Sequence, residues 1–151
     1  MNINTFTLQQ LHRPGSSSGN CTVTERLSTD FVVNGQSLLR QLVEKNGGHA
    51  DFMGCFVKGH PVQNSKMLAE LLVLSDQSSE PAPIHIYICP ECGDIACGVY
   101  SVHVEKKSGY YEWSKFHYFN GYEVPHLVEE IGPFCFEEKA YELALESAAA
   151  L

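Results

Sequence analysis

The stretch GVYSVHVEKKSGYYEWSKFHYF, residues 98–119, constrains the fold more than any other part of the chain. Its two halves are rich in β-branched and aromatic residues, which favour strands, and they flank Ser108-Gly109, a dipeptide suited to a two-residue hairpin turn. In the register that this turn sets, Val104 lies opposite Trp113 and Tyr100 lies opposite His117. We therefore expect an antiparallel hairpin at the centre of a sheet.

Apolar residues at helical spacing predict three helices. The segment QSLLRQLVEKNGG, residues 36–48, places its leucines on one side of a helix and ends at two glycines, which favour helix termination. The segment HPVQNSKMLAELLVL, residues 60–74, has a proline in its first turn and an apolar stripe behind it. A last helix is predicted from about 137 to 149, where two glutamates suit the N-terminal end of the helix dipole.

Further strands are predicted before the hairpin. In PIHIYIC, residues 83–89, isoleucines alternate with other residues, so the isoleucines are expected on one face and Tyr87 beside His85 on the opposite face. The first 30 residues are interpreted as irregular strands interrupted by a loop, RPGSSSGN, at 13–20. A short β-branched run, FVV, follows at 31–33.

A length of 151 residues suits a single domain with a substantial core. The polar segment SDQSSEPAP, residues 75–83, is the best linker candidate, but the halves on either side are too incomplete to fold alone. We predict one α+β domain over residues 1–151, an antiparallel sheet with a central hairpin that is packed by about three helices. The cysteine-containing turn and hairpin occupy residues 84–119 of it.

Negative charge is concentrated in the second half of the chain. Residues 1–75 carry six Lys and Arg against five Asp and Glu, a balance of +1, whereas residues 76–151 carry four against 13, a balance of −9. A field of that sign repels nucleic acid and anionic membranes, and it favours a basic protein partner or simply a solvated acidic face. We therefore expect no nucleic-acid or membrane partner.

Three of the six cysteines lie within nine positions, in CPECGDIAC, residues 89–97. Two thiolates three residues apart can converge on one zinc ion when glycine permits a tight turn, so Cys89, Cys92 and Cys97 are candidate ligands. The fourth ligand would come from Cys135, from His85 or His103, or from a more distant histidine. Two alternatives remain open: a metal-free turn packed with small thiols, and a redox pair, which Asp94 disfavours because a nearby negative charge raises a thiol pKa.

No catalytic constellation is recognisable in the sequence. It contains no HExxH, P-loop or dinucleotide-binding pattern. There is no apolar run of the roughly 20 residues that a membrane helix needs, and the first residues lack the features of a signal peptide. We expect a cytoplasmic protein whose cysteines are reduced and which is not an enzyme, with thiol redox chemistry as the nearest enzymatic alternative.

The block from about residue 51 to residue 145 resembles a group of small, poorly characterised bacterial proteins. Their shared mark, a CPECGD-x-x-CG turn, stands here as CPECGDIACG, residues 89–98. The hairpin VYSVHVEKKSGYYEWSKFHY and the helix segment GPFCFEEKAYELAL are similar to other parts of the group's pattern, while the first 50 residues match only loosely. The resemblance implies a compact α+β protein of the kind encoded as an immunity partner beside a toxin, including contact-dependent inhibition systems.

Charge and resemblance together predict a non-enzymatic immunity protein that binds and neutralises a cognate toxin, a basic nuclease. An acidic protein can occupy a basic cleft and gain association rate from electrostatic steering. Acidic and aromatic side chains of the second half are the candidate contacts: Asp94, Glu112, Glu123, Glu129, Glu130, Tyr110 and Tyr122. Trp113 and at least half of the tyrosines are expected in the core instead. The alternative is a small structural or regulatory protein that holds one zinc ion at the Cys89/Cys92/Cys97 turn.

Overall fold

The central hairpin forms as the sequence predicts. In a computed structural model of the chain, β8 (Val99–Lys107) and β9 (Tyr110–Phe119) pair antiparallel across a two-residue turn, with Lys107 opposite Tyr110 and Val104 opposite Trp113. Gly109 has a φ of +85°, a conformation that glycine adopts without strain. The structure describes residues 3–13, 16–18, 21–23, 26–47, 52–74, 83–88, 98–120 and 124–150.

The hairpin belongs to an antiparallel six-stranded sheet whose order is β10-β9-β8-β7-β6, with β11 also paired to β9. Its other strands are β6 (Met53–Gly54), β7 (Ile84–Ile88), β10 (His126–Leu127) and β11 (Phe134–Glu137). A second antiparallel sheet has the order β1-β4-β5 and consists of β1 (Phe6–Arg13), β4 (Arg26–Val33) and β5 (Gln36–Ser37). Together with three helices, these sheets form the predicted single α+β domain.

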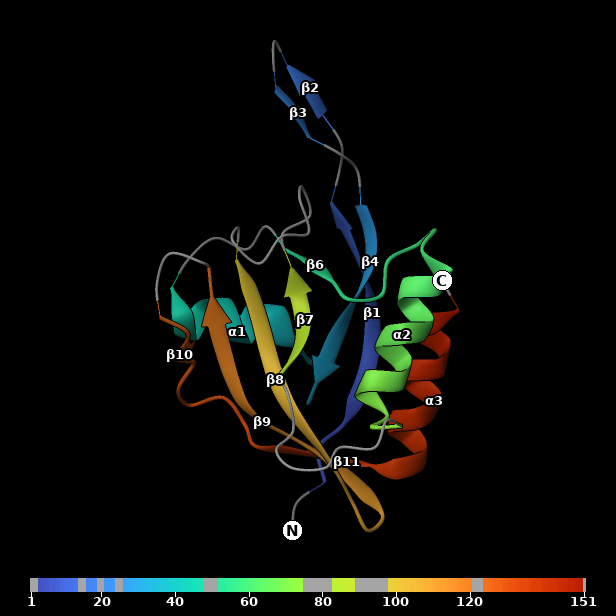
Figure 1. Ribbon diagram of the computed structural model, residues 1–151. Coiled ribbons are helices and arrows are strands. Elements are labelled where there is room, and N and C mark those ends of the chain that lie inside the picture. Colours follow the sequence, from blue (N-terminus) through green and yellow to red (C-terminus); the bar gives the residue numbers. More distant parts are fainter. Residues whose placement is uncertain are drawn as a thin grey trace.

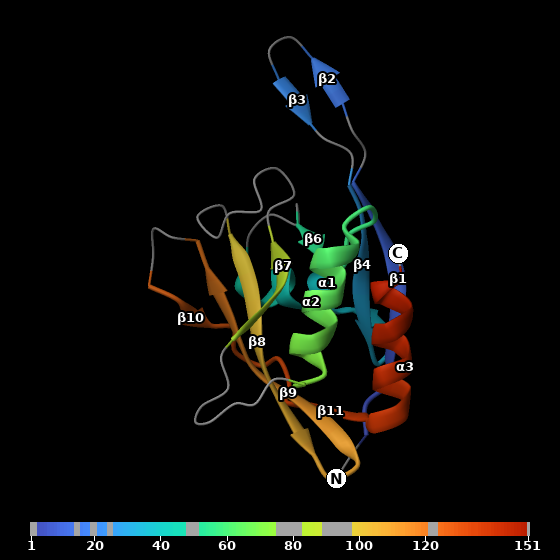
Figure 2. The same ribbon diagram turned by 45° about the vertical axis from the view of Figure 1, so that its right-hand side comes forward.

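The N-terminal prediction was wrong in one respect. β2 (Ser16–Ser18) lies in the segment interpreted as a loop and pairs with β3 (Cys21–Val23), which follows that segment. This short hairpin extends beyond the ends of β1 and β4 (Figures 1 and 2). The small and polar residues of this stretch gave no alternating apolar pattern from which a strand could be predicted.

In the described part of the chain, backbone contacts join the two sheets at two places. Near β6, the backbone of β4 binds the following segment, because the Thr29 N–H donates to the carbonyl oxygen of Phe56 at 3.1 Å. Gly54 makes this approach possible, since a Cβ atom at that position would lie 1.9 Å from the Thr29 carbonyl oxygen. At the other place, Asn4 forms a parallel bridge with Phe136 of β11.

All three predicted helices are present and lie within a few residues of their expected bounds. They are α1 (Leu38–Asn46), α2 (Pro61–Leu71) and α3 (Glu138–Ala149). The Ser37 hydroxyl caps α1 by accepting from the Arg40 N–H, and the Glu137 carboxylate caps α3 by accepting from the Ala140 N–H. Helices α2 and α3 lie beside each other, and α1 lies behind the large sheet in the view of Figure 1.

The core is aromatic and lies between the two sheets and the helices. Trp113 of β9 is fully buried and makes edge-to-face contacts with Phe6 and Phe31 of the small sheet. Its indole N–H donates to the Tyr141 hydroxyl at 3.0 Å, and that hydroxyl donates to the Leu71 carbonyl at 2.7 Å. This chain of bonds fixes α2 and α3 to the large sheet. As expected, Trp113 and four of the seven tyrosines are core residues: Tyr87, Tyr100, Tyr111 and Tyr141.

Two β-bulges shift side chains from their predicted positions. In β9, a bulge at Lys115, whose φ is +55°, places Tyr100 opposite Tyr118, so the predicted pairing of Tyr100 with His117 is wrong. In β7, a bulge between His85 and Tyr87 turns Tyr87 into the core, although simple alternation predicted it beside His85.

Candidate protein-binding site

Three of the five predicted acidic contact residues line one hollow in the surface. The hollow has a volume of about 450 Å³, and Glu112, Glu129 and Glu130 line it together with Lys115. We call it the β9 hollow. Three further members of the predicted contact set lie outside the described residues: Asp94, Tyr122 and Glu123. The structure therefore gathers, at one place, all of the predicted acidic contacts that it describes.

The strand arrangement explains why a depression forms there. Both β10 and β11 pair with the same edge of β9, β10 with His117 and Tyr118, and β11 with residues 110–113. The bulged part of β9 lies between these two pairings. Residues 128–133 cross this interval, and the Val128 N–H donates to the Phe116 carbonyl at 2.7 Å. An interval in the pairing of a strand edge thus leaves room for the hollow.

Apolar side chains form much of the lining. They come from β10 and from the segment that follows it: Leu127, Val128, Ile131 and Pro133. Leu127 is 48% exposed, which is high for a leucine, while Val128 is buried. An apolar surface beside acidic groups matches the anatomy of protein interfaces, in which an apolar centre has a polar rim.

Contacts with α1 hold the acidic side of the hollow. The Lys45 ammonium lies 3.0 Å from the Glu130 carboxylate, and both side chains are largely exposed. The neighbouring Asn46 accepts a hydrogen bond at 2.6 Å from the Nε2 of His126 in β10. Asn46 also donates to the Tyr100 hydroxyl at 3.3 Å. The last turn of α1 is thus attached to β8, to β10 and to the segment that lines the hollow.

Most other carboxylates of the described second half already have partners. Glu105 accepts from Lys107 at 2.7 Å, which lowers the pKa of Glu105 and raises the pKa of Lys107. The Lys106 ammonium lies 3.7 Å from the Glu138 carboxylate. Glu142 accepts from the Tyr111 hydroxyl at 2.7 Å, and Glu137 caps α3. Fewer carboxylates of the second half are therefore available to a binding partner than the charge count suggests.

Glu112 and Glu129, unlike the lysine-paired glutamates, have no ion-pair partner among the described residues. Glu129 is exposed and Glu112 is half-buried on the outer side of β9. Glu112 adds to the effect of burial in raising the pKa of the neighbouring Cys135 thiol. These two carboxylates are available to a partner.

The predicted aromatic contact does not join the hollow. Tyr110 is half-buried at the start of β9, opposite Lys107 and Glu137, at the other end of the β11 pairing. Sequence reasoning missed the apolar part of the site instead. Its signal was present in VPHLVEEIGP, residues 124–133, where apolar residues surround two glutamates, and Val124 in this segment is 83% exposed.

The candidate zinc ligands Cys89, Cys92 and Cys97 lie outside the described residues. Among the residues that the structure does describe, no three His, Cys, Asp or Glu side chains are close enough to hold a metal ion. Cys135 pairs with Glu112, which pairs with Glu105, six residues along β8 from Val99, or about 20 Å. Cys135 thus lies toward the hairpin end of β8, away from Val99, and its role as a fourth ligand stays a prediction.

The cysteines that the structure describes with their side chains are not activated. Cys55 is buried, and burial raises the pKa of its thiol far above the ordinary value. Burial is also the main cause of the raised pKa of Cys135. Thiolate chemistry needs the opposite shift, so neither residue suits a nucleophile.

In the described part of the chain, no helix combines the length and apolar character needed to cross a lipid bilayer. No protein-family model, curated protein or solved structure was found to match this chain.

Proposed function

We propose that this protein is a non-enzymatic immunity protein that binds and neutralises a basic cognate toxin domain. The observation that carries the proposal is the β9 hollow, where Glu112 and Glu129 flank an exposed apolar lining. Steering by the net charge of −8 accelerates encounter with a basic partner, and the apolar lining supplies area that is buried on contact.

Inhibition would follow from occupation of the toxin's basic cleft. A nuclease cleft is lined by Lys and Arg because its substrate is a polyanion. An acidic surface placed in that cleft excludes the substrate without any chemistry of its own. The predicted cytoplasmic location places the inhibitor where a toxin that has entered the cell would act.

The test begins with the gene immediately upstream: if it encodes a large secreted protein, the C-terminal domain of that protein is co-expressed with this chain. We expect that domain to co-purify with this chain and cells that produce both to survive. The double variant Glu112→Gln/Glu129→Gln is expected to associate more slowly and with less salt dependence. Survival without complex formation, or a toxin domain that does not bind at all, would contradict the proposal.

A second candidate is a structural zinc site at the cysteine turn. One observation favours it: Ile88 and Val99, which border residues 89–98, are paired in neighbouring antiparallel strands, so the cysteine segment begins and ends close together in space. Elemental analysis of the purified protein tests this. Near-stoichiometric zinc, with loss of folded structure on chelation, would support a metal-stabilised turn. Such a site is compatible with an inhibitor, since a bound ion can stabilise a binding protein.

A further inference from the structure

We infer that the β9 hollow receives a single cationic side chain, Arg or Lys, from the partner. This inference rests on the proposed function for the identity of the partner and goes beyond it in naming the group that is bound. Long cationic side chains place an aliphatic stem against apolar surface and keep the charged end in a polar environment. The β9 hollow has an apolar wall that can contact such a stem and carboxylates that can bind the charged end.

The apolar part of the hollow suits the stem. Leu127 is 48% exposed, and with Ile131 and Pro133 it forms an apolar wall on the outer side of β9. Covering a half-exposed leucine removes apolar surface from water, which is favourable in proportion to the area covered. A small inorganic cation would gain nothing from this wall, whereas an aliphatic stem would.

The acidic part suits the charged end. Glu112 approaches from β9, and Glu129 approaches from the segment after β10, so two carboxylates border the hollow from different elements. An Arg guanidinium presents several donors in one plane and can bind two carboxylates at once. Glu130 lines the same hollow, and the Lys45 ammonium offsets its charge.

The charges that line the hollow, including that of Lys115, decide between a cationic and an anionic occupant. It is the one cation among the described residues that line the hollow, and it occupies the bulge of β9. With Glu130 paired to Lys45, the other two carboxylates still outnumber the one ammonium, so the lining is net negative. An anionic ligand would be repelled by Glu112 and Glu129, which is why the occupant is assigned as a cation.

The experiment is a titration of the ¹⁵N-labelled protein with N-acetyl-arginine amide, followed by amide chemical shifts. N-acetyl-lysine amide is the second arm, and N-acetyl-citrulline amide, which has nearly the same shape without the charge, is the control. We expect saturable shifts centred on residues 112–115 and 127–131 with the cationic probes only. The ratio of the two cationic affinities decides between Arg and Lys.

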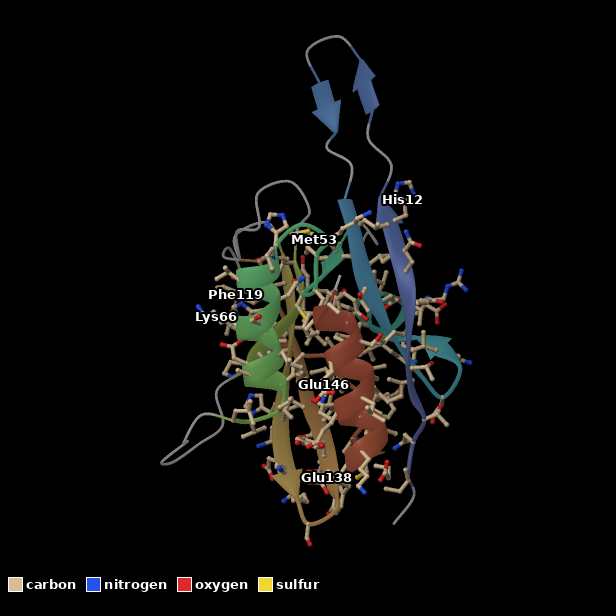
Figure 3. All side chains as sticks on the ribbon, turned by 90° about the vertical axis from the view of Figure 1, so that its right-hand side faces the viewer. His12, Met53, Lys66, Phe119, Glu138 and Glu146 are labelled. Carbon is tan, nitrogen blue, oxygen red and sulfur yellow. The ribbon has the colours of Figure 1, made fainter. Side chains whose placement is uncertain are left out.

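Variants test the carboxylates without affecting the core. Glu129→Gln and Glu112→Gln are each expected to weaken binding of the probe about 2- to 5-fold, the range of exposed ion pairs. The matched control is Glu146→Gln, because Glu146 is exposed on α3, on the side of the molecule that carries α2 and α3 (Figure 3). It is expected to leave the affinity unchanged.

The outcomes separate this inference from the proposed function. Equal shifts with the citrulline probe, or equal weakening by Glu146→Gln, would overturn the inference even if the toxin domain co-purifies. A toxin domain that binds with full affinity to the Glu112→Gln/Glu129→Gln variant would also overturn it. Specific binding of the arginine probe together with a toxin domain that never binds would leave the cationic site in place and remove the immunity function.

Discussion

The Tyr87 hydroxyl donates a 2.5 Å hydrogen bond to the Asp30 carboxylate, and both side chains are buried. The same hydroxyl accepts from the Phe31 N–H at 3.2 Å, so one oxygen connects β7 to two consecutive residues of β4. Asp30 also accepts from the Ser37 hydroxyl, the N-cap of α1, and from the Gln9 amide of β1. A buried carboxylate thus orders three strands and the start of a helix.

Replacement of Tyr87 by phenylalanine should be strongly destabilising. Tyr87→Phe leaves the Asp30 oxygen and the Phe31 N–H without this partner in the core, and buried groups that lose a hydrogen bond cost about 1–3 kcal/mol each. We expect the free energy of unfolding to fall by about 2–4 kcal/mol in urea denaturation. Tyr110→Phe, at a half-buried position on β9, is the control and should change it by less than about 0.5 kcal/mol. Similar decreases in the free energy of unfolding of the two variants would show that the hydrogen bond to Asp30 does not account for the effect of Tyr87→Phe.

The contact between β4 and β6 should not tolerate a methyl group. Gly54→Ala would place a Cβ atom 1.9 Å from the Thr29 carbonyl oxygen, a distance that requires the strands to separate. We expect a loss of at least about 3 kcal/mol, or failure to fold. Gly59→Ala is the control: a Cβ there meets nothing within 4 Å, but φ is +89°, so only backbone strain of about 1 kcal/mol is expected. Thermal unfolding followed by circular dichroism compares the two, and equal effects would contradict the crowding argument.

Stability should decline at alkaline pH. Burial raises the pKa of Cys55, Tyr87 and Tyr141 in the folded state above their ordinary values. The folded protein therefore keeps protons that the unfolded chain releases, so the stabilisation is complete below the unfolded pKa values, about 8.5 for Cys and about 10 for Tyr, and is lost as pH rises. We expect the urea midpoint to fall progressively above pH 8.5. Cys55→Ala should reduce the slope between about pH 8.5 and 10, and an unchanged slope would be inconsistent with this origin.

Removal of the Lys45 ammonium should affect binding more than stability. The Lys45–Glu130 pair is largely exposed, and such pairs contribute at most about 1 kcal/mol. Lys45→Met should therefore leave the free energy of unfolding nearly unchanged while making the β9 hollow more negative. We expect faster association with the arginine probe or a basic partner, measured at low ionic strength. A slower association would indicate that Lys45 matters chiefly by holding Glu130 in place.

The local parts of the fold could be predicted from the sequence. The Ser108-Gly109 turn sets the pairing of Val104 with Trp113, and Pro61 and Gly47 mark helix ends, because each of these signals acts within a few residues. The bulges could not be predicted. Lys115 adopts a positive φ that few lysines adopt, and a shift of one residue moves every following side chain to another partner.

The candidate site was predictable in composition but not in shape. Charge counting selected Glu112, Glu129 and Glu130, yet their proximity depends on β10 and β11 sharing one edge of β9, a long-range arrangement without a local signal. Sequence counting also treated all carboxylates alike. It did not show that Glu105 pairs with Lys107 two residues along the same strand, or that Glu138 pairs with Lys106, a contact between a helix and a strand.

The bridge between Asn4 and Phe136 has a consequence for the synthesis of the protein. The Asn4 N–H donates to the Cys135 carbonyl at 2.7 Å, so this link cannot form until residue 136 has left the ribosome. The β1–β4 hairpin can pair early, but Phe6 on its apolar face then waits for more than a hundred further residues before β11 and α3 cover it. During translation this incomplete surface is where a chaperone would be expected to attach.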